Sequence, residues 1–193
     1  MNKEKLVVFP EVSLLEAELK REKYKNKYWS VFRSTVYVLI TVAAIAVLVA
    51  TLWLPVLQIY GNSMTPTLQE GNICVSAKSQ SYEQGDIVAF YYNNKILIKR
   101  VIAGPGEWVD IDDDGTVFVD GVMIEEPYIT DKAYGDCNIE LPYQVPEARI
   151  FVMGDHRSVS VDSRNSFVGC IAEEQCVGRL VFRVWPLSQF GRI

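Results

Sequence analysis

The residues that could carry out chemistry gather in three short segments of this 193-residue chain. Residues 61–68 contain Ser63, residues 99–106 begin with Lys99, and residues 154–164 contain His156, the only histidine. A serine hydroxyl is a poor nucleophile until a base removes its proton. Ser63 therefore needs a partner, and the candidates are His156 or a lysine, of which Lys99 is the best placed.

Lys99 lies within the apolar run Ile-Leu-Ile-Lys-Arg-Val-Ile at residues 96–102. The run predicts a β-strand, and alternation puts Leu97, Lys99 and Val101 on one face. If that face is buried, desolvation lowers the pKa of the amine well below ~10.4, and a neutral amine can act as a general base. The commoner alternative is an exposed lysine whose stem covers apolar surface.

These residues need elements that position them, and the first such element is an uncharged stretch at residues 34–69. As a helix, residues 35–54 would be about 30 Å long, enough to cross the hydrocarbon core of a bilayer. The net charge is +3 over residues 1–33 and −8 over residues 70–193. The positive-inside bias therefore predicts a cytoplasmic N-terminus. A buried core helix and a cleaved secretory signal are weaker alternatives, because both are usually shorter.

We therefore predict a polar cytoplasmic lead at residues 1–33, a transmembrane anchor at 34–57 and an extracytoplasmic domain at 58–193. Apolar runs separated by Gly, Asn and Asp predict that this domain is mainly β, built of coiled antiparallel sheets. The dipeptides Asn93-Asn94, Asp114-Gly115 and Asp120-Gly121 indicate hairpin turns. The strands are expected at residues 73–77, 86–91, 96–103, 108–111, 117–119, 150–153 and 178–184.

The composition excludes several classes of protein. A net charge of −5 argues against a nucleic-acid partner. A single His excludes a zinc site with two or three His ligands, and the four Cys form no C-x-x-C pair. No metal or organic cofactor is expected. Cys170 and Cys176 could form a disulfide outside the cytoplasm or remain free thiols, and the sequence leaves both open.

In order and type, the three segments resemble the bacterial type I signal peptidases, a family of membrane-anchored serine proteases. Residues 63–68 match the family motif S-M-x-P-T-L. Residues 99–106 match K-R-V-I-G-x-P-G, with Ala103-Gly104 replacing Gly-x. Residues 154–164 match G-D-N-R-x-x-S-x-D-S-R, except that His156 replaces Asn. The resemblance runs from the anchor through Pro186.

The resemblance implies a role for each matched residue. Ser63 would attack the scissile carbonyl, and Lys99, held neutral, would take the Ser63 proton and later activate the hydrolytic water. Ser160 would orient the Lys99 amine through a hydrogen bond. Asp162 and Arg164 would support the loop as an ion pair. A carboxylate near the amine would favour the ammonium, so Asp162 is expected to point away from Lys99, as is Asp155.

The backbone N–H of Ser63 could supply one oxyanion donor. Some family members add a serine two residues before the nucleophile, but this position is Gly61, so the second donor is unidentified. An extended substrate would add to a β-edge. Ile59 and Met64 are candidates for lining its pockets.

The resemblance also implies substrates and a location. The chain would cut exported preproteins after small residues, typically Ala-x-Ala, at the outer face of the plasma membrane. Its partners would be preproteins, the lipid bilayer and the nearby secretion translocon. One alternative is a dedicated peptidase of the same fold that serves a conjugation or pilus system. Another is a catalytically silent β-domain that binds secreted subunits, although Ser63 and Lys99 weigh against it.

Overall fold

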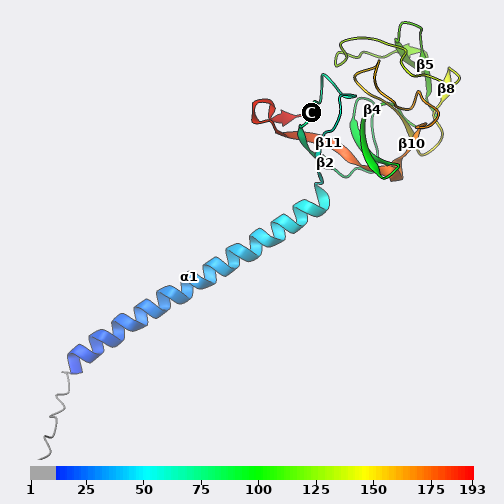
Figure 1. Ribbon diagram of the computed structural model, residues 1–193. Coiled ribbons are helices and arrows are strands. Elements are labelled where there is room, and N and C mark those ends of the chain that lie inside the picture. Colours follow the sequence, from blue (N-terminus) through cyan, green and yellow to red (C-terminus); the bar gives the residue numbers. More distant parts are fainter. Residues whose placement is uncertain (1–11) are drawn as a thin grey trace, which may run out of the picture. The chain divides into compact units, whose positions relative to one another are not determined.

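The computed structural model describes residues 12–193, and only the backbone of residues 51–53. It contains one long helix followed by two antiparallel β-sheets (Figure 1). The chain divides into two compact units, Met1–Val49 and Ala50–Ile193. The second unit contains every strand, so the predicted fold class, one apolar helix and a mainly β domain, is confirmed.

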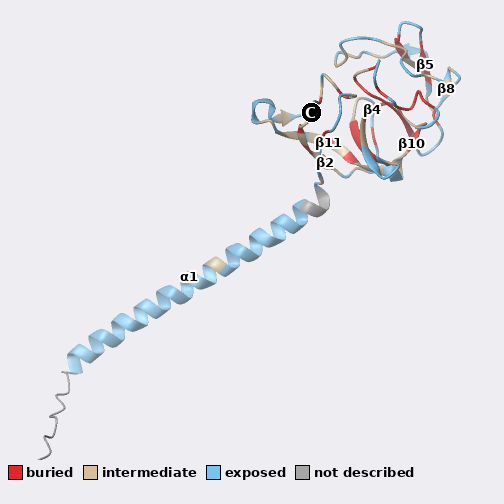
Figure 2. Cartoon of the chain, viewed as in Figure 1, coloured by how far each residue is buried: buried red, intermediate tan, exposed pale blue. Residues whose placement is uncertain are grey.

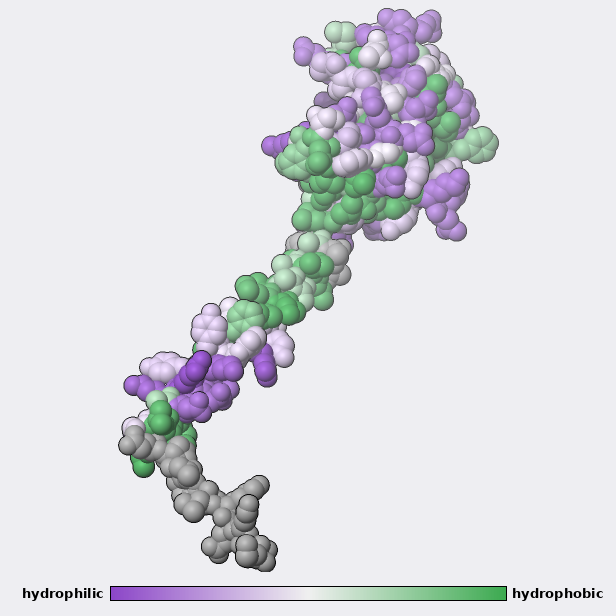
Figure 3. Space-filling model, turned by 60° about the vertical axis from the view of Figure 1, so that its left-hand side comes forward, coloured by the Kyte–Doolittle hydropathy of each residue, from purple (hydrophilic) through white to green (hydrophobic). Residues whose placement is uncertain are grey.

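Helix α1 spans Val12–Trp53 and contains neither Gly nor Pro. It ends just before Pro55, which lacks the N–H that would continue a helix. Its residues 12–50 are long and apolar enough to cross a membrane, and nearly all of them are exposed (Figure 2). Along α1, a charged N-terminal part is followed by an apolar surface (Figure 3).

The bounds of helix α1 are not those of the predicted anchor, residues 34–57. The helix begins well before the expected anchor, because helix-forming Glu, Lys and Leu residues fill the polar lead. At the other end, α1 stops at Trp53, and Val56 and Leu57, the last positions of the predicted anchor, lie in strand β1. Part of the predicted polar lead, residues 1–11, lies outside the described residues.

The larger sheet has the strand order β1-β2-β11-β3-β4-β9-β10, with β12 beside β11. The smaller sheet has the order β7-β6-β5-β8. Every pairing is antiparallel. The strands of the larger sheet are β1 (Val56–Gln58), β2 (Ile73–Ala77), β3 (Ile87–Tyr92), β4 (Lys95–Ala103), β9 (Arg149–Met153), β10 (Ile171–Ala172), β11 (Cys176–Trp185) and β12 (Gly191–Arg192). The strands of the smaller sheet are β5 (Trp108–Ile111), β6 (Val117–Val119), β7 (Val122–Met123) and β8 (Tyr143–Gln144). Two short 3₁₀ turns, η1 (Glu173–Gln175) and η2 (Leu187–Gln189), flank strand β11 of the larger sheet.

All seven predicted strands are present, within two residues of their expected ends. The hairpin between β3 and β4 turns at Asn93 and Asn94, whose φ angles of 44° and 61° suit the tight turn predicted there. This hairpin places Lys99 opposite Val88 in the register. The alternation along β4 is also confirmed, because Leu97 and Val101 pack into one apolar cluster and Ile98 into another.

Two features of the larger sheet leave strand edges unpaired. Strand β1 ends the strand order, so only its β2 side is bonded. Strand β4 pairs with β3 from Lys95 to Arg100, but with β9 only from Arg100 onward. The first half of β4, up to Lys99, therefore has one free edge.

The disulfide between Cys170 and Cys176 is not formed, and all four cysteines are free. The two thiols belong to different apolar clusters, which explains why they do not meet. Burial raises the pKa of each thiol to about 11.

Candidate functional site

Ser63 lies at the start of a helical turn that follows β1. The loop is closed by hydrogen bonds between Ile59 and residues 71 and 72, at 3.0 and 2.8 Å. Within the turn, the Leu68 N–H donates to the Met64 carbonyl at 2.8 Å. Ile59, Met64 and Leu68 are all buried in one apolar cluster. Burial of these side chains fixes the backbone that carries the Ser63 hydroxyl.

Lys99 reaches the same place from strand β4. Its Nζ lies 2.6 Å from Ser63 Oγ, and the residue is only 3% exposed. Desolvation lowers the pKa of the Lys99 amine to about 8, with a further lowering by the Arg164 charge. Of the two environments considered for Lys99, the structure shows the buried one, and its amine is at hydrogen-bond distance from Ser63.

The two nearby aspartates are engaged by arginines. Asp162 binds Arg164 at 2.8 Å and the Gly154 N–H at 3.0 Å. Asp155 binds Arg100 at 2.7 Å. Each carboxylate raises the pKa of Lys99 electrostatically, but less than burial lowers it. Neither carboxylate accepts a described hydrogen bond from Lys99, as expected from the sequence. The pKa of the amine therefore stays low.

Ser160 departs from its prediction. The residue is 2% exposed, and its Oγ has no hydrogen-bond partner among the described residues. The predicted hydrogen bond to the Lys99 amine is therefore not formed here, and the described hydrogen bond of that amine goes to Ser63. A buried hydroxyl without a partner is unfavourable, so this group is unusual among buried polar side chains.

His156 does not contact the Ser63 hydroxyl within the described hydrogen bonds. Its Nδ1 lies 3.0 Å from Thr65 Oγ1, and its backbone N–H donates to the Ser63 carbonyl at 3.1 Å. The Ser63 N–H itself donates to no group in the described part of the chain. The histidine thus holds the Ser63 backbone while its ring is turned to a threonine.

A cavity of about 670 Å³ opens beside Ser63 and Lys99. One side comes from β1 and the loop after it, and the other comes from the first half of β4, so the two unpaired strand edges border it. Ile59 and Met64, both predicted as pocket residues, line it. The remaining lining residues are Val56, Leu57, Gln58, Tyr60, Gly61, Lys95, Ile96, Leu97 and Ile98. Most of them are apolar, so the cavity suits an extended, uncharged peptide segment.

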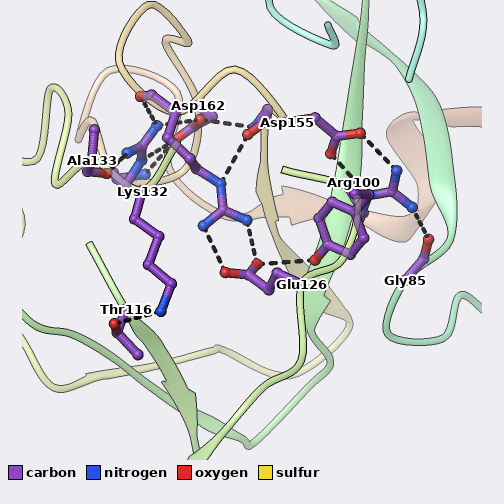
Figure 4. Close-up of polar contacts among 12 residues, drawn as sticks. Gly85, Arg100, Thr116, Glu126, Lys132, Ala133, Asp155 and Asp162 are labelled. Carbon is purple, nitrogen blue, oxygen red and sulfur yellow. Dashed lines mark hydrogen bonds and ion pairs between the residues drawn. The ribbon is translucent and has the colours of Figure 1, made fainter. Parts of the chain in front are cut away.

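The sequence reasoning missed a buried set of charges around the site. Arg157 forms an ion pair with Glu126, and both side chains are almost fully buried. Tyr128 donates to Glu126 at 2.9 Å, and its ring lies 3.8 Å from the Arg100 guanidinium (Figure 4). Arg157 was visible only as a motif position, and no sequence signal points to Glu126. In residues 12–193, no cluster of three or more His, Cys, Asp or Glu is placed to hold a metal ion.

Comparison with known proteins finds several similar chains. Residues 32–185 match the family model described as signal peptidase, peptidase S26. The chain is 38% identical over 153 residues to signal peptidase IB of Staphylococcus aureus strain COL, covering 68% of this chain and 78% of that protein. It is 33% identical over 187 residues to signal peptidase I of Bacillus licheniformis, covering 89% and 97%. A crystal structure of a signal peptidase I from Enterococcus faecalis V583 is similar with a TM-score of 0.45 and 30% identity, covering 52% of this chain and 97% of that one.

Proposed function

This chain belongs to the signal peptidase family, peptidase S26, and on that premise we propose that it is a membrane-anchored serine endopeptidase that removes signal peptides from exported preproteins. The observation that supports the proposal most directly is the 2.6 Å contact between Lys99 Nζ and Ser63 Oγ. A serine hydroxyl becomes a nucleophile when a base at hydrogen-bond distance can take its proton. Lys99 is such a base, because burial brings the pKa of its amine to about 8.

In the first step, the neutral Lys99 amine takes the Ser63 proton while Oγ attacks the carbonyl carbon of the scissile bond. The resulting ammonium returns a proton to the leaving amine, and the signal peptide stays on Ser63 as an ester. In the second step, Lys99 takes a proton from water, whose oxygen attacks the ester carbonyl. The ammonium then returns that proton to the departing Ser63 Oγ, and the signal peptide leaves with a free carboxyl group. One buried amine thus serves as base and acid in both steps.

The negative charge on the attacked carbonyl oxygen needs hydrogen-bond donors. The backbone N–H of Ser63 is free to donate within the described structure. One such donor lowers the barrier by roughly 3 kcal/mol in comparable sites. Gly61 has no side-chain donor, so any second donor comes from elsewhere.

Ser160 fits the acyl-enzyme stage of this reaction. While Ser63 is free, its Oγ is the hydrogen-bond partner of the Lys99 amine. Once Ser63 is esterified, the amine needs another acceptor to keep it aimed at water. The buried Ser160 Oγ lacks a partner and lies in the loop that holds Ser63, so it is the group we assign to that role.

The substrate would bind in the cavity beside Ser63 as an extended segment. The free edges of β1 and β4 offer backbone N–H and C=O groups, which pair with any extended peptide regardless of its side chains. Selectivity then comes from the apolar pockets at Ile59 and Met64, which would admit small side chains such as those of Ala-x-Ala. Asp162 and Arg164 would brace the loop without touching the substrate.

The proposed topology follows from charge. Residues 1–33 carry the excess of Lys and Arg, so they would lie in the cytoplasm. Helix α1 would cross the plasma membrane once, with the catalytic domain, residues 58–193, on the outer side. Signal peptides leave the translocon in the same bilayer, so the enzyme would work close to it.

The test is cleavage of a preprotein by the detergent-solubilised chain, with the cut position read by mass spectrometry. We expect cuts after Ala-x-Ala in many preproteins, no cleavage by Ser63→Ala, and most of the activity retained by His156→Ala. We expect Lys99→Ala to be inactive as well, and an active Lys99→Ala together with an inactive His156→Ala would replace the lysine mechanism with a histidine one. A single accepted substrate would indicate the dedicated peptidase, and binding without cutting would indicate the silent domain.

A further inference from the structure

The loop at residues 154–164 controls where Ser63 lies. The His156 N–H donates to the Ser63 carbonyl at 3.1 Å. A Cβ atom added at Gly154 would lie 2.5 Å from the same carbonyl oxygen, so this backbone approaches the nucleophile as closely as glycine allows. A displacement of the loop therefore displaces Ser63, and with it the contact to Lys99.

Two fully buried arginines hold this loop, and they find their counter-charges in different places. Arg164 pairs with Asp162 inside the loop. Arg157 donates from Nε to the Gly154 carbonyl at 3.1 Å, and its carboxylate partner is Glu126, 31 positions earlier in the chain. Glu126 follows β7 in the connection to β8, so it comes from the smaller sheet rather than from the three motifs.

Glu126 also reaches the strand that carries the base. It accepts a hydrogen bond from the Tyr128 hydroxyl at 2.9 Å, and the Tyr128 ring stacks on the Arg100 guanidinium at 3.8 Å. Arg100 follows Lys99 in β4 and is bound to Asp155, the residue next to Gly154. Figure 4 shows the Glu126 carboxylate, which binds the Arg157 guanidinium on one side and the Tyr128 hydroxyl on the other.

From this geometry we propose that Glu126 is a positioning residue, which holds the loop of Ser63 and the strand of Lys99 at a fixed separation. The inference rests on the proposed Ser63–Lys99 reaction. The carboxylate neutralises Arg157, which has no other described ion pair, and a buried arginine left without a counter-charge is strongly unfavourable. Without that charge, Arg157 turns toward water and the Gly154 carbonyl loses its donor.

The test compares Glu126→Gln with Glu125→Gln, whose exposed side chain makes none of the described hydrogen bonds or ion pairs. We expect Glu126→Gln to lower kcat by roughly 10- to 100-fold, because a shift of about 1 Å between reacting groups can cost ~100-fold. We expect KM to stay within about twofold, since the cavity is unchanged. The Glu125→Gln variant keeps the parent values.

The pH profile separates positioning from mere stability. A loosened loop admits water beside Lys99, which favours the ammonium, so the midpoint of the acid limb of kcat/KM moves to higher pH in Glu126→Gln. A lower amount of folded enzyme would scale the whole profile without moving its midpoint. If Glu126→Gln does not fold, Tyr128→Phe tests the same link, because it leaves the Glu126–Arg157 pair in place and removes one hydrogen bond. For Tyr128→Phe we expect a smaller fall in kcat, with the same upward movement.

The inference is overturned if folded Glu126→Gln has the kcat and the pH midpoint of the parent. If Glu126→Gln does not fold, it is overturned by a folded Tyr128→Phe variant with the kcat and midpoint of the parent. Such a result leaves the proposed function standing, because the parent chain still cleaves preprotein and Ser63→Ala does not. If the parent itself fails to cleave, the proposed function fails first, and the inference falls with it.

Discussion

Lys99 determines how the proposed reaction depends on pH. The base must be neutral, and the pKa of its amine is lowered to about 8. We therefore expect kcat/KM to rise with pH, with half of its maximum near pH 8. On the acid side it falls about tenfold for each pH unit, because one proton is removed. Initial rates on a preprotein between about pH 5 and 10 measure this, and a flat profile over the acid half contradicts a lysine base.

The burial of Lys99 also lowers the free energy of unfolding of the chain. Below about pH 8 both the folded and the unfolded chain hold the proton, so the folded state bears the full desolvation penalty. The penalty shrinks between pH 8 and the ordinary pKa of 10.5, and it is absent above that.

We expect Lys99→Met, which keeps the length of the side chain without its charge, to be inactive but more stable. The free energy of unfolding near pH 7 rises by about 3 kcal/mol, since each pKa unit corresponds to ~1.4 kcal/mol. The gain declines toward pH 10.5. Denaturant unfolding at the two pH values checks this, and an equal gain at both would show that the charge is not the cause.

The motif residues could be found from their types and order, whereas their contacts could not. Ser63 and Lys99 meet as expected, but Ser160 makes no hydrogen bond to the amine. Glu126 could not be found at all, since the pair Glu125-Glu126 before Pro127 is an ordinary surface pattern. Only the folded chain brings it to Arg157.

At the scale of elements, the end of β9 must pass very close to the Ser63 turn. Gly154 follows directly after β9, and a Cβ there would meet both the Ser160 side chain and the Ser63 carbonyl. We expect Gly154→Ala to lower the free energy of unfolding by about 1–3 kcal/mol, as overpacking does. It should also reduce kcat more than it changes KM.

A matched control is Gly191→Ala in β12, where an added Cβ meets nothing within 4 Å. Unfolding curves and steady-state kinetics of the two variants make the comparison. If Gly154→Ala behaves like Gly191→Ala, the close approach does not constrain the site.

Six of the seven predicted strands have four or more residues, and the seventh, β6, lies between the predicted turns at Asp114-Gly115 and Asp120-Gly121. Apolar alternation and the Asn-Asn turn locate β3 and β4, because these signals are local. The strands that were missed, β1, β7, β8, β10 and β12, have only two or three residues. Such short segments lack a period, and they are strands only because a partner lies beside them. One of them, β1, borders the cavity, so the substrate groove was only partly foreseen.

At the scale of the whole molecule, the catalytic domain has its own core. All three apolar clusters are built from residues 57–193. We expect a chain without residues 1–49 to unfold at the same temperature as the full chain in detergent, and to cleave a soluble peptide with the same kcat. Cleavage of preproteins embedded in vesicles should be slower, because the anchor no longer concentrates enzyme at the membrane. A truncated chain that does not fold would show that the helix contributes to the core.

Charge asymmetry and one apolar stretch sufficed to predict the division into helix and β domain. The way in which the smaller sheet supports the larger one could not be predicted. Residues 124–142 form no strand, yet Ala133 and Tyr134 carbonyls accept from Arg164, and Glu126 binds Arg157. Contacts of this kind join distant, irregular segments, and neither spacing nor hydropathy encodes them.

The four free thiols have a consequence for how this protein matures. An enzyme that processes exported proteins is needed before any exported oxidant can be released to work. Because no covalent cross-link completes this fold, the newly made domain reaches its working form without help from thiol-oxidising catalysts, which themselves depend on export. The raised pKa of Cys170 and Cys176 also keeps both thiols in the protonated form, which is the less reactive one.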